Sequence, residues 1–91
     1  MTRKDLLESA LRATTERGVE YGKPEDNFAT IARLWRAYLG VAVNAQDVAM
    51  MMVLFKVARA KSAPGHGDNL VDIAGYAACA AELGTRNELE R

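Results

Sequence analysis

Four apolar segments separated by glycine and proline constrain the fold most. Along the 91 residues, apolar side chains recur three or four positions apart, and no segment alternates as a strand does. Gly18, Gly40 and Gly84 follow the last apolar positions of three segments, where glycine typically ends a helix. The predicted helices span residues 3–17, 24–39, 45–61 and 69–83, with a polar tail over 85–91. We therefore expect a single all-α domain built as a four-helix bundle.

Local signals mark several helix starts. Thr2 followed by Asp5 resembles a capping box, and Asn44 is a good cap with Asp47 in the first turn. Pro24 suits a first helical position. These positions predict where the first three helices begin.

The predicted helices differ in how much of their own surface is apolar. Residues 45–61 are apolar nearly all round until Lys56, which predicts that this is the central helix. Residues 24–39 carry a broad apolar face. The stretch "AGYAACAA" in residues 69–83 is rich in small side chains, which allow another helix to approach closely. A chain this small is marginal alone, so we expect a homo-oligomer.

Charge and hydropathy narrow the class of partner. Twelve basic and twelve acidic residues cancel, and Arg33 and Arg36 form only a small basic face, so nucleic acid is not an expected partner. The longest apolar run, "VAMMMVLF", is too short to span a bilayer. "MTRKDLLESAL" resembles neither a signal peptide nor an anchor. The lone Cys79 fits a reducing compartment or a small buried side chain, and we expect a cytoplasmic location.

The candidate chemistry lies where the third and fourth segments join. Asp68 and Asp72 share one stripe of the fourth helix, and Lys56 and Arg59 share one of the third. A short connection makes the two helices antiparallel, so Arg59 comes level with Asp68, and Lys56 with Asp72. Either these residues form ion pairs that fix the hairpin, or they line a pocket. In the pocket, Lys56 and Arg59 would hold a phosphate, and Asp68 and Asp72 would hold Mg²⁺ or a ligand hydroxyl.

Four further side chains are candidates at the rim of this pocket. His66 lies in a glycine-rich loop, where it is either solvated or able to reach an anion at the start of the fourth helix. Tyr76, one turn after Asp72, either supplies a hydroxyl or packs. Tyr21 and Asn27, in "EYGKPEDNF", either stabilise that loop or approach the ligand.

Three stretches together resemble a known group. "YGKPEDNFATIARLW", "DVAMMMVLFKVAR" and "GHGDNLVDIAGYAA" are similar to a family of small phage and prophage proteins of unknown function, over residues 17 to 83. The pattern more distantly resembles the MazG-like all-α nucleotide pyrophosphohydrolases. That resemblance implies an oligomeric helical bundle in which acids hold Mg²⁺ on a nucleoside triphosphate.

The MazG-like motifs are incomplete in this chain. "NLVD", Asn69 to Asp72, stands where that superfamily has ExxD, with Asn in place of Glu. "MMVLFK" stands where EExxE is expected, so Lys56 would neutralise Asp72 in place of a metal. The resemblance implies a phage-type protein that binds or hydrolyses nucleoside phosphates with Mg²⁺, in the host cytoplasm if phage-encoded. The alternative is a non-enzymatic oligomeric accessory protein that acts through protein contacts.

Overall fold

The described part of the chain forms four helices. The computed structural model describes the backbone of residues 1–21 and 24–89, and the side chains of residues 1–16 and 27–84. The helices are α1 (Arg3–Tyr21), α2 (Pro24–Leu39), α3 (Ala45–Ser62) and α4 (Gly67–Leu89). The described residues contain no strand, which confirms the all-α prediction.

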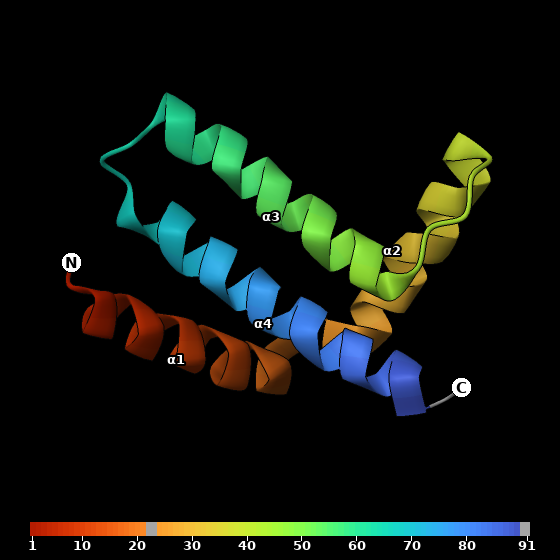
Figure 1. Cartoon of the computed structure of the whole chain (residues 1–91), viewed down its shortest axis with the longest axis horizontal. Helices are drawn as coiled ribbons and strands as arrows, with labels where there is room; N and C mark the ends of the chain where they lie inside the picture. The colour runs from red at the N-terminus through yellow and green to blue at the C-terminus, as the bar shows by residue number, and fades with distance from the viewer. Residues whose placement is uncertain (22–23, 90–91) are drawn as a thin grey trace.

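The helix at the centre of the fold is α4. It runs antiparallel to α3 on one side, packs against α1 on another, and contacts α2 near one end (Figure 1). The α2 helix also packs against α3, but it diverges from the α3–α4 hairpin (Figure 1). The prediction that residues 45–61 form the central helix is therefore wrong, because much of the apolar surface of α3 is exposed.

Small residues explain why α4 occupies the centre. Gly75 is buried, and a methyl group added there would lie 3.7 Å from the Thr14 methyl of α1. Ala80 is 4% exposed, and its carbonyl accepts a hydrogen bond of 3.0 Å from the Gln46 side chain of α3. Because these side chains are short, neighbouring helices approach α4 from two sides.

Glycine ends one helix and lies within two others. Gly40 has φ +72° and its N–H donates to the Arg36 carbonyl at 2.8 Å, so it ends α2 as predicted. The α1 helix instead continues through Gly18 to Tyr21, and α4 continues through Gly84 to Leu89. Among the described glycines only Gly40 has the left-handed backbone that stops a helix. Glycine lowers helix propensity, but it does not by itself end a helix.

Two capping boxes form as the sequence indicates. The Asp47 N–H donates to the Asn44 side chain at 2.8 Å, and the Asn44 N–H donates to the Asp47 carboxylate at 3.0 Å. Thr2 and Asp5 make the same reciprocal pair at 3.1 Å. The Thr2 N–H lowers the pKa of the Asp5 carboxyl below its usual value. These bonds satisfy amide groups that the first turns of α3 and α1 leave without helical partners.

The core lies where α2, α3 and α4 meet. Its buried members include Phe28, Ala32, Val43, Val48, Ala49, Ala80 and Leu83. The Arg36 guanidinium donates to the Val43 carbonyl at 3.2 Å, which ties the α2–α3 connection to α2. The outer half of the apolar face of α2 has no cover from the described residues: Leu34 is 65% and Tyr38 is 89% exposed.

Candidate functional site

A cleft opens between α3 and α4, beside the loop that connects them. Its volume is about 580 Å³. Eight side chains or backbone segments line it: Lys56, Arg59, Ser62, Ala63, His66, Asp68, Asn69 and Asp72. Five of the eight residues that the sequence nominated as ligands are therefore brought together here, namely Lys56, Arg59, His66, Asp68 and Asp72.

The floor of the cleft holds an ion pair. The Lys56 ammonium lies 2.9 Å from the Asp72 carboxylate, and the two side chains are only 19% and 16% exposed. The antiparallel register inferred from the sequence brings these two residues level, and the contact is confirmed. Because both groups are largely desolvated, each depends on the opposite charge.

The second pair expected from the sequence does not form. Arg59 and Asp68 both line the cleft and are exposed, but no ion pair within 4 Å joins them. The Arg59 guanidinium instead lies 5.8 Å from the centre of the Phe55 ring, and the Lys56 ammonium lies 5.9 Å from the same ring. Cations favour this position over an aromatic face. Among the described residues, no carboxylate forms an ion pair with the Arg59 guanidinium at the rim of the cleft.

The connecting loop completes the cleft wall. The His66 N–H donates to the Ala63 carbonyl at 3.1 Å, and the Asn69 N–H donates to the His66 carbonyl at 3.2 Å. These bonds hold the exposed imidazole of His66 beside the start of α4. Asn69 is 7% exposed and is the one buried polar residue among those described. The sequence did not nominate Asn69, although its position one turn before Asp72 was a usable signal.

Three of the nominated residues do not line the cleft. Tyr76 packs against Phe28, with ring centres 6.1 Å apart, beside the core. Asn27 is exposed on α2 and does not line the cleft. The Tyr21 side chain falls outside the described residues. Beyond Asp72 the same stripe of α4 faces the core and not the cleft, since Tyr76 and Cys79 pack against the core residues.

The carboxylates do not fit a metal held by protein ligands alone. Within residues 1–16 and 27–84, no three acidic, histidine or cysteine side chains gather as a metal cluster. Asp68 and Asp72 provide two carboxylates, and Lys56 already contacts Asp72. Mg²⁺ tolerates so few protein ligands when substrate phosphates supply the others. The tentative assignment of Asp68 and Asp72 as metal ligands therefore stays a prediction that requires a phosphate ligand.

Fold and sequence together define the class: a small helical protein of phage type. Residues 5–84 match the family described as Domain of unknown function (DUF6378), and the chain belongs to this family. This match confirms the predicted resemblance to a family of unknown function.

Two curated relatives come from mycobacteriophages. The Gene 55 protein of Mycobacterium phage D29 is 41% identical over 81 residues, which cover 88% of this chain and 54% of that protein. The Gene 55 protein of Mycobacterium phage L5 is 48% identical over 63 residues, which cover 68% of this chain and 40% of that protein. The chain thus spans about half the length, or less, of these relatives.

Neither the family description nor the names of the two relatives mention a MazG-like protein, so that resemblance stays a prediction. No solved structure gives a significant match to the chain. Within the described residues, no helix has both the length and the hydropathy needed to cross a membrane.

Proposed function

We propose that this phage-type protein binds a nucleoside phosphate in the α3–α4 cleft and acts in the host cytoplasm as a homo-oligomer. The observation that carries the proposal is the arrangement of Arg59, at the rim of a cleft of about 580 Å³, beside the partly buried Lys56–Asp72 pair. The planar guanidinium matches phosphate geometry, and no carboxylate in the described part of the chain lies within ion-pair distance of it.

The surroundings of Arg59 support a nucleoside phosphate over a bare anion. Phe55 does not line the cleft, but its ring is 51% exposed and lies 5.8 Å from the Arg59 guanidinium at the rim, so a base that extends past the rim can stack on it. His66 adds a second donor on the loop side of the cleft. The Asp68 carboxylate can accept a hydrogen bond from a ribose hydroxyl, or it can contact a Mg²⁺ ion bound to the phosphates.

Lys56 has a different role in this proposal. Its ammonium is engaged by Asp72 at 2.9 Å, so the pair forms a fixed wall of the cleft and neutralises a carboxylate that would repel phosphate. We therefore assign binding to the cleft. Hydrolysis of the bound nucleotide with Mg²⁺ is a further possibility that measurement of pyrophosphate release decides.

Calorimetric titration tests the proposal. We titrate a magnesium nucleoside triphosphate, a nucleoside monophosphate and inorganic pyrophosphate into the protein and into Arg59→Met. Loss of a charged hydrogen bond of about 1.5–3 kcal/mol weakens binding roughly tenfold to a hundredfold. The control Arg33→Met removes an exposed arginine of α2 whose guanidinium donates to the Thr30 hydroxyl at 3.4 Å, outside the cleft lining, and it should leave binding unchanged.

The variant Phe55→Leu distinguishes the contribution of the base to binding from that of the phosphate. We expect it to weaken nucleotide binding and to leave pyrophosphate binding unaffected, because only the nucleoside stacks on the ring. No heat of binding with any of the three ligands, or equal binding by Arg59→Met, contradicts the proposal.

A second candidate function is that of a non-enzymatic accessory protein acting through protein contacts. The observation that favours it is the exposed apolar side of α3, which includes Met50, Leu54 and Val57. The two functions are compatible, because this side of α3 is turned away from the cleft.

A further inference from the structure

The outward side of α3 carries a regular stripe of exposed residues. We define the outer stripe as Asp47, Met50, Leu54, Val57 and Lys61, spaced three and four residues apart in alternation. All five are exposed, and Leu54 is 65% exposed. An average spacing of 3.5 residues is that of a seam between two paired helices. Solitary surface helices do not need such a seam, because their outward side is polar.

We infer that the outer stripe pairs with the outer stripe of a second copy, antiparallel and around a two-fold axis at Leu54. A two-fold interface requires a surface that is complementary to itself. The stripe meets this requirement because Asp47 and Lys61 lie seven residues on either side of Leu54. Antiparallel pairing places the Asp47 carboxylate level with Lys61 of the second copy, and the apolar residues between them face one another.

The surface area of the chain supports a partner of this size. A compact monomer of 9.9 kDa should expose about 5,200 Å². This chain exposes 6703 Å², roughly 1,500 Å² more than that expectation. A standard interface covers about 800 Å² per partner, and obligate dimers cover more. The radius of gyration, 13.9 Å, also exceeds the roughly 12 Å expected of a compact chain of this length.

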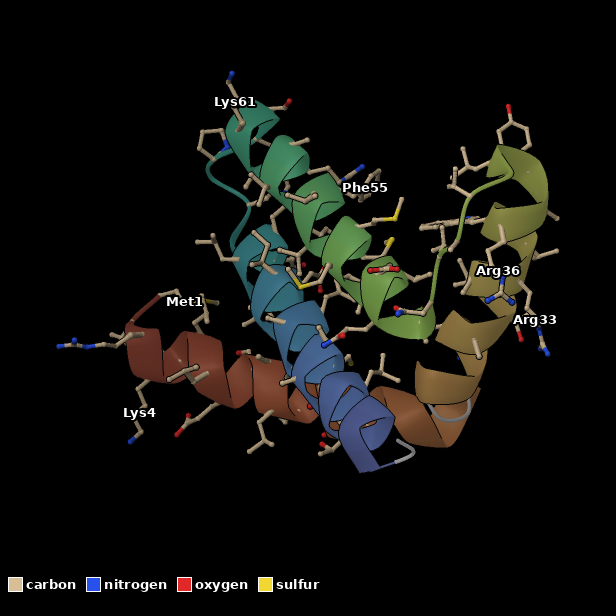
Figure 2. All side chains as sticks on the ribbon, turned by 45° about the vertical axis from the view of Figure 1, so that its right-hand side comes forward. Met1, Lys4, Arg33, Arg36, Phe55 and Lys61 are labelled. Atoms are coloured by element: carbon tan, nitrogen blue, oxygen red, sulfur yellow. The ribbon has the colours of Figure 1, made fainter. Side chains whose placement is uncertain are left out.

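The charges on the stripe favour a second copy over a lipid surface. A helix that lies on an anionic membrane carries basic residues along both edges of its apolar side. Here one end of the stripe is acidic and the other basic, which suits an inverted copy and opposes an anionic surface. Lys61 projects from the far end of α3, and Phe55 lies on the side of α3 away from α4, next to the stripe (Figure 2).

Dimerisation through the outer stripe leaves the cleft open. On a helix with about 100° per residue, Lys56 lies about 160° from Leu54, and Arg59 about 140°. The inferred dimer therefore presents two clefts on its outer sides. The inference does not depend on the proposed ligand, since it rests on the opposite side of α3.

The first experiment measures mass by sedimentation equilibrium at tens of micromolar. We expect wild-type protein at twice the monomer mass of 9.9 kDa and Leu54→Glu as a monomer, with dimerisation weakened at least about a hundredfold. The matched control is Leu7→Glu on α1, because Leu7 is 63% exposed and Leu54 is 65% exposed. Monomeric wild type, dimeric Leu54→Glu or monomeric Leu7→Glu each overturns the inference.

The second experiment determines orientation in a Cys79→Ser background. Leu54→Cys and Lys61→Cys are each treated with a short bismaleimide crosslinker. In the antiparallel dimer the two copies of residue 54 are adjacent, while the two copies of residue 61 lie about 21 Å apart along the seam. Efficient crosslinking at 54 alone supports the inference. Crosslinking at 61, which indicates a parallel pair, or at neither position overturns it.

Discussion

The α3 and α4 helices run side by side, yet they use their apolar residues in opposite ways. The α3 helix is apolar nearly all round, but only Val48 and Ala49 are buried in it. The α4 helix has smaller side chains and packs against α1, α2 and α3. The comparison teaches that a helix takes the central position in a fold when its side chains are small enough for neighbouring helices to approach closely. A continuous apolar surface can instead indicate a second partner.

The largest effect on stability should come from removing the Asp72 carboxylate, which pairs with Lys56 between α4 and α3. Asp72→Leu leaves the Lys56 ammonium, 19% exposed, without the carboxylate at 2.9 Å. We expect a loss of about 3 kcal/mol, the lower end for a buried pair because some exposure remains. Urea denaturation measures it. The control Glu8→Leu breaks the exposed pair with Lys4 and should cost under about 1 kcal/mol. Equal small effects of both would contradict a desolvated pair.

The next test compares two valines of α3. Val48 is 0% exposed and Val57 is 48% exposed. Val48→Ala should cost about 2 kcal/mol through lost contacts and a cavity. Val57→Ala should cost less than about 0.5 kcal/mol in samples dilute enough to be monomeric. Denaturation midpoints measure both, and a larger effect of Val57→Ala under those conditions would refute the assignment of the two sides.

The capping box of α3 should have an intermediate effect. Because α3 buries little of its own surface, its first turn depends on Asn44, whose side chain accepts from the Asp47 N–H. We expect Asn44→Ala to lower stability by about 1 kcal/mol. Thermal denaturation is the measurement. Asn44→Asp, which retains an accepting oxygen, should lose little, and an equal loss in both variants would speak against the cap.

Two glycines of α4 should give the smallest effects, of opposite sign. At Gly75 an added methyl meets only the Thr14 methyl at van der Waals distance, so Gly75→Ala should stabilise by roughly 0.5–1 kcal/mol. At Gly84 it would collide with the Gln46 amide, which donates to the Ala80 carbonyl. We expect Gly84→Ala to destabilise the protein slightly, because the Gln46 amide must shift away from the Ala80 carbonyl. Calorimetric melting temperatures decide, and a large loss in Gly75→Ala would contradict the α1–α4 packing.

Much of the local structure could be predicted from the sequence. Helix caps act through neighbouring backbone amides, so they can be predicted without knowledge of tertiary contacts. Asn44 and Gly40 are two such residues. The contact between Lys56 and Asp72 also followed, because a short loop fixes the register of an antiparallel hairpin. These features depend on residues close together in the chain or one hairpin apart.

Other features depend on packing that helical periodicity does not encode. Gly18 and Gly84 remain helical because the surrounding backbone does not adopt positive φ there. Arg59 lies beside Phe55 and away from Asp68, since an exposed side chain has several accessible partners. Tyr76 packs against Phe28 of α2, a contact between two helices that are not neighbours in the chain. These outcomes depend on contacts between distant helices, or on which of several partners an exposed side chain meets, and helical periodicity specifies neither.

The most direct test of the account is a double-mutant cycle on the two residues that join α3 and α4 at the cleft. The unfolding free energies of Lys56→Met, Asp72→Leu and the double variant are compared with the wild type. Contacts that either residue makes elsewhere cancel in the cycle. We expect a coupling of about 2 kcal/mol between the two residues, so the double variant should lose about 2 kcal/mol less than the sum of the two single losses. Additive losses, with coupling near zero, would contradict a desolvated ion pair in the wall of the cleft.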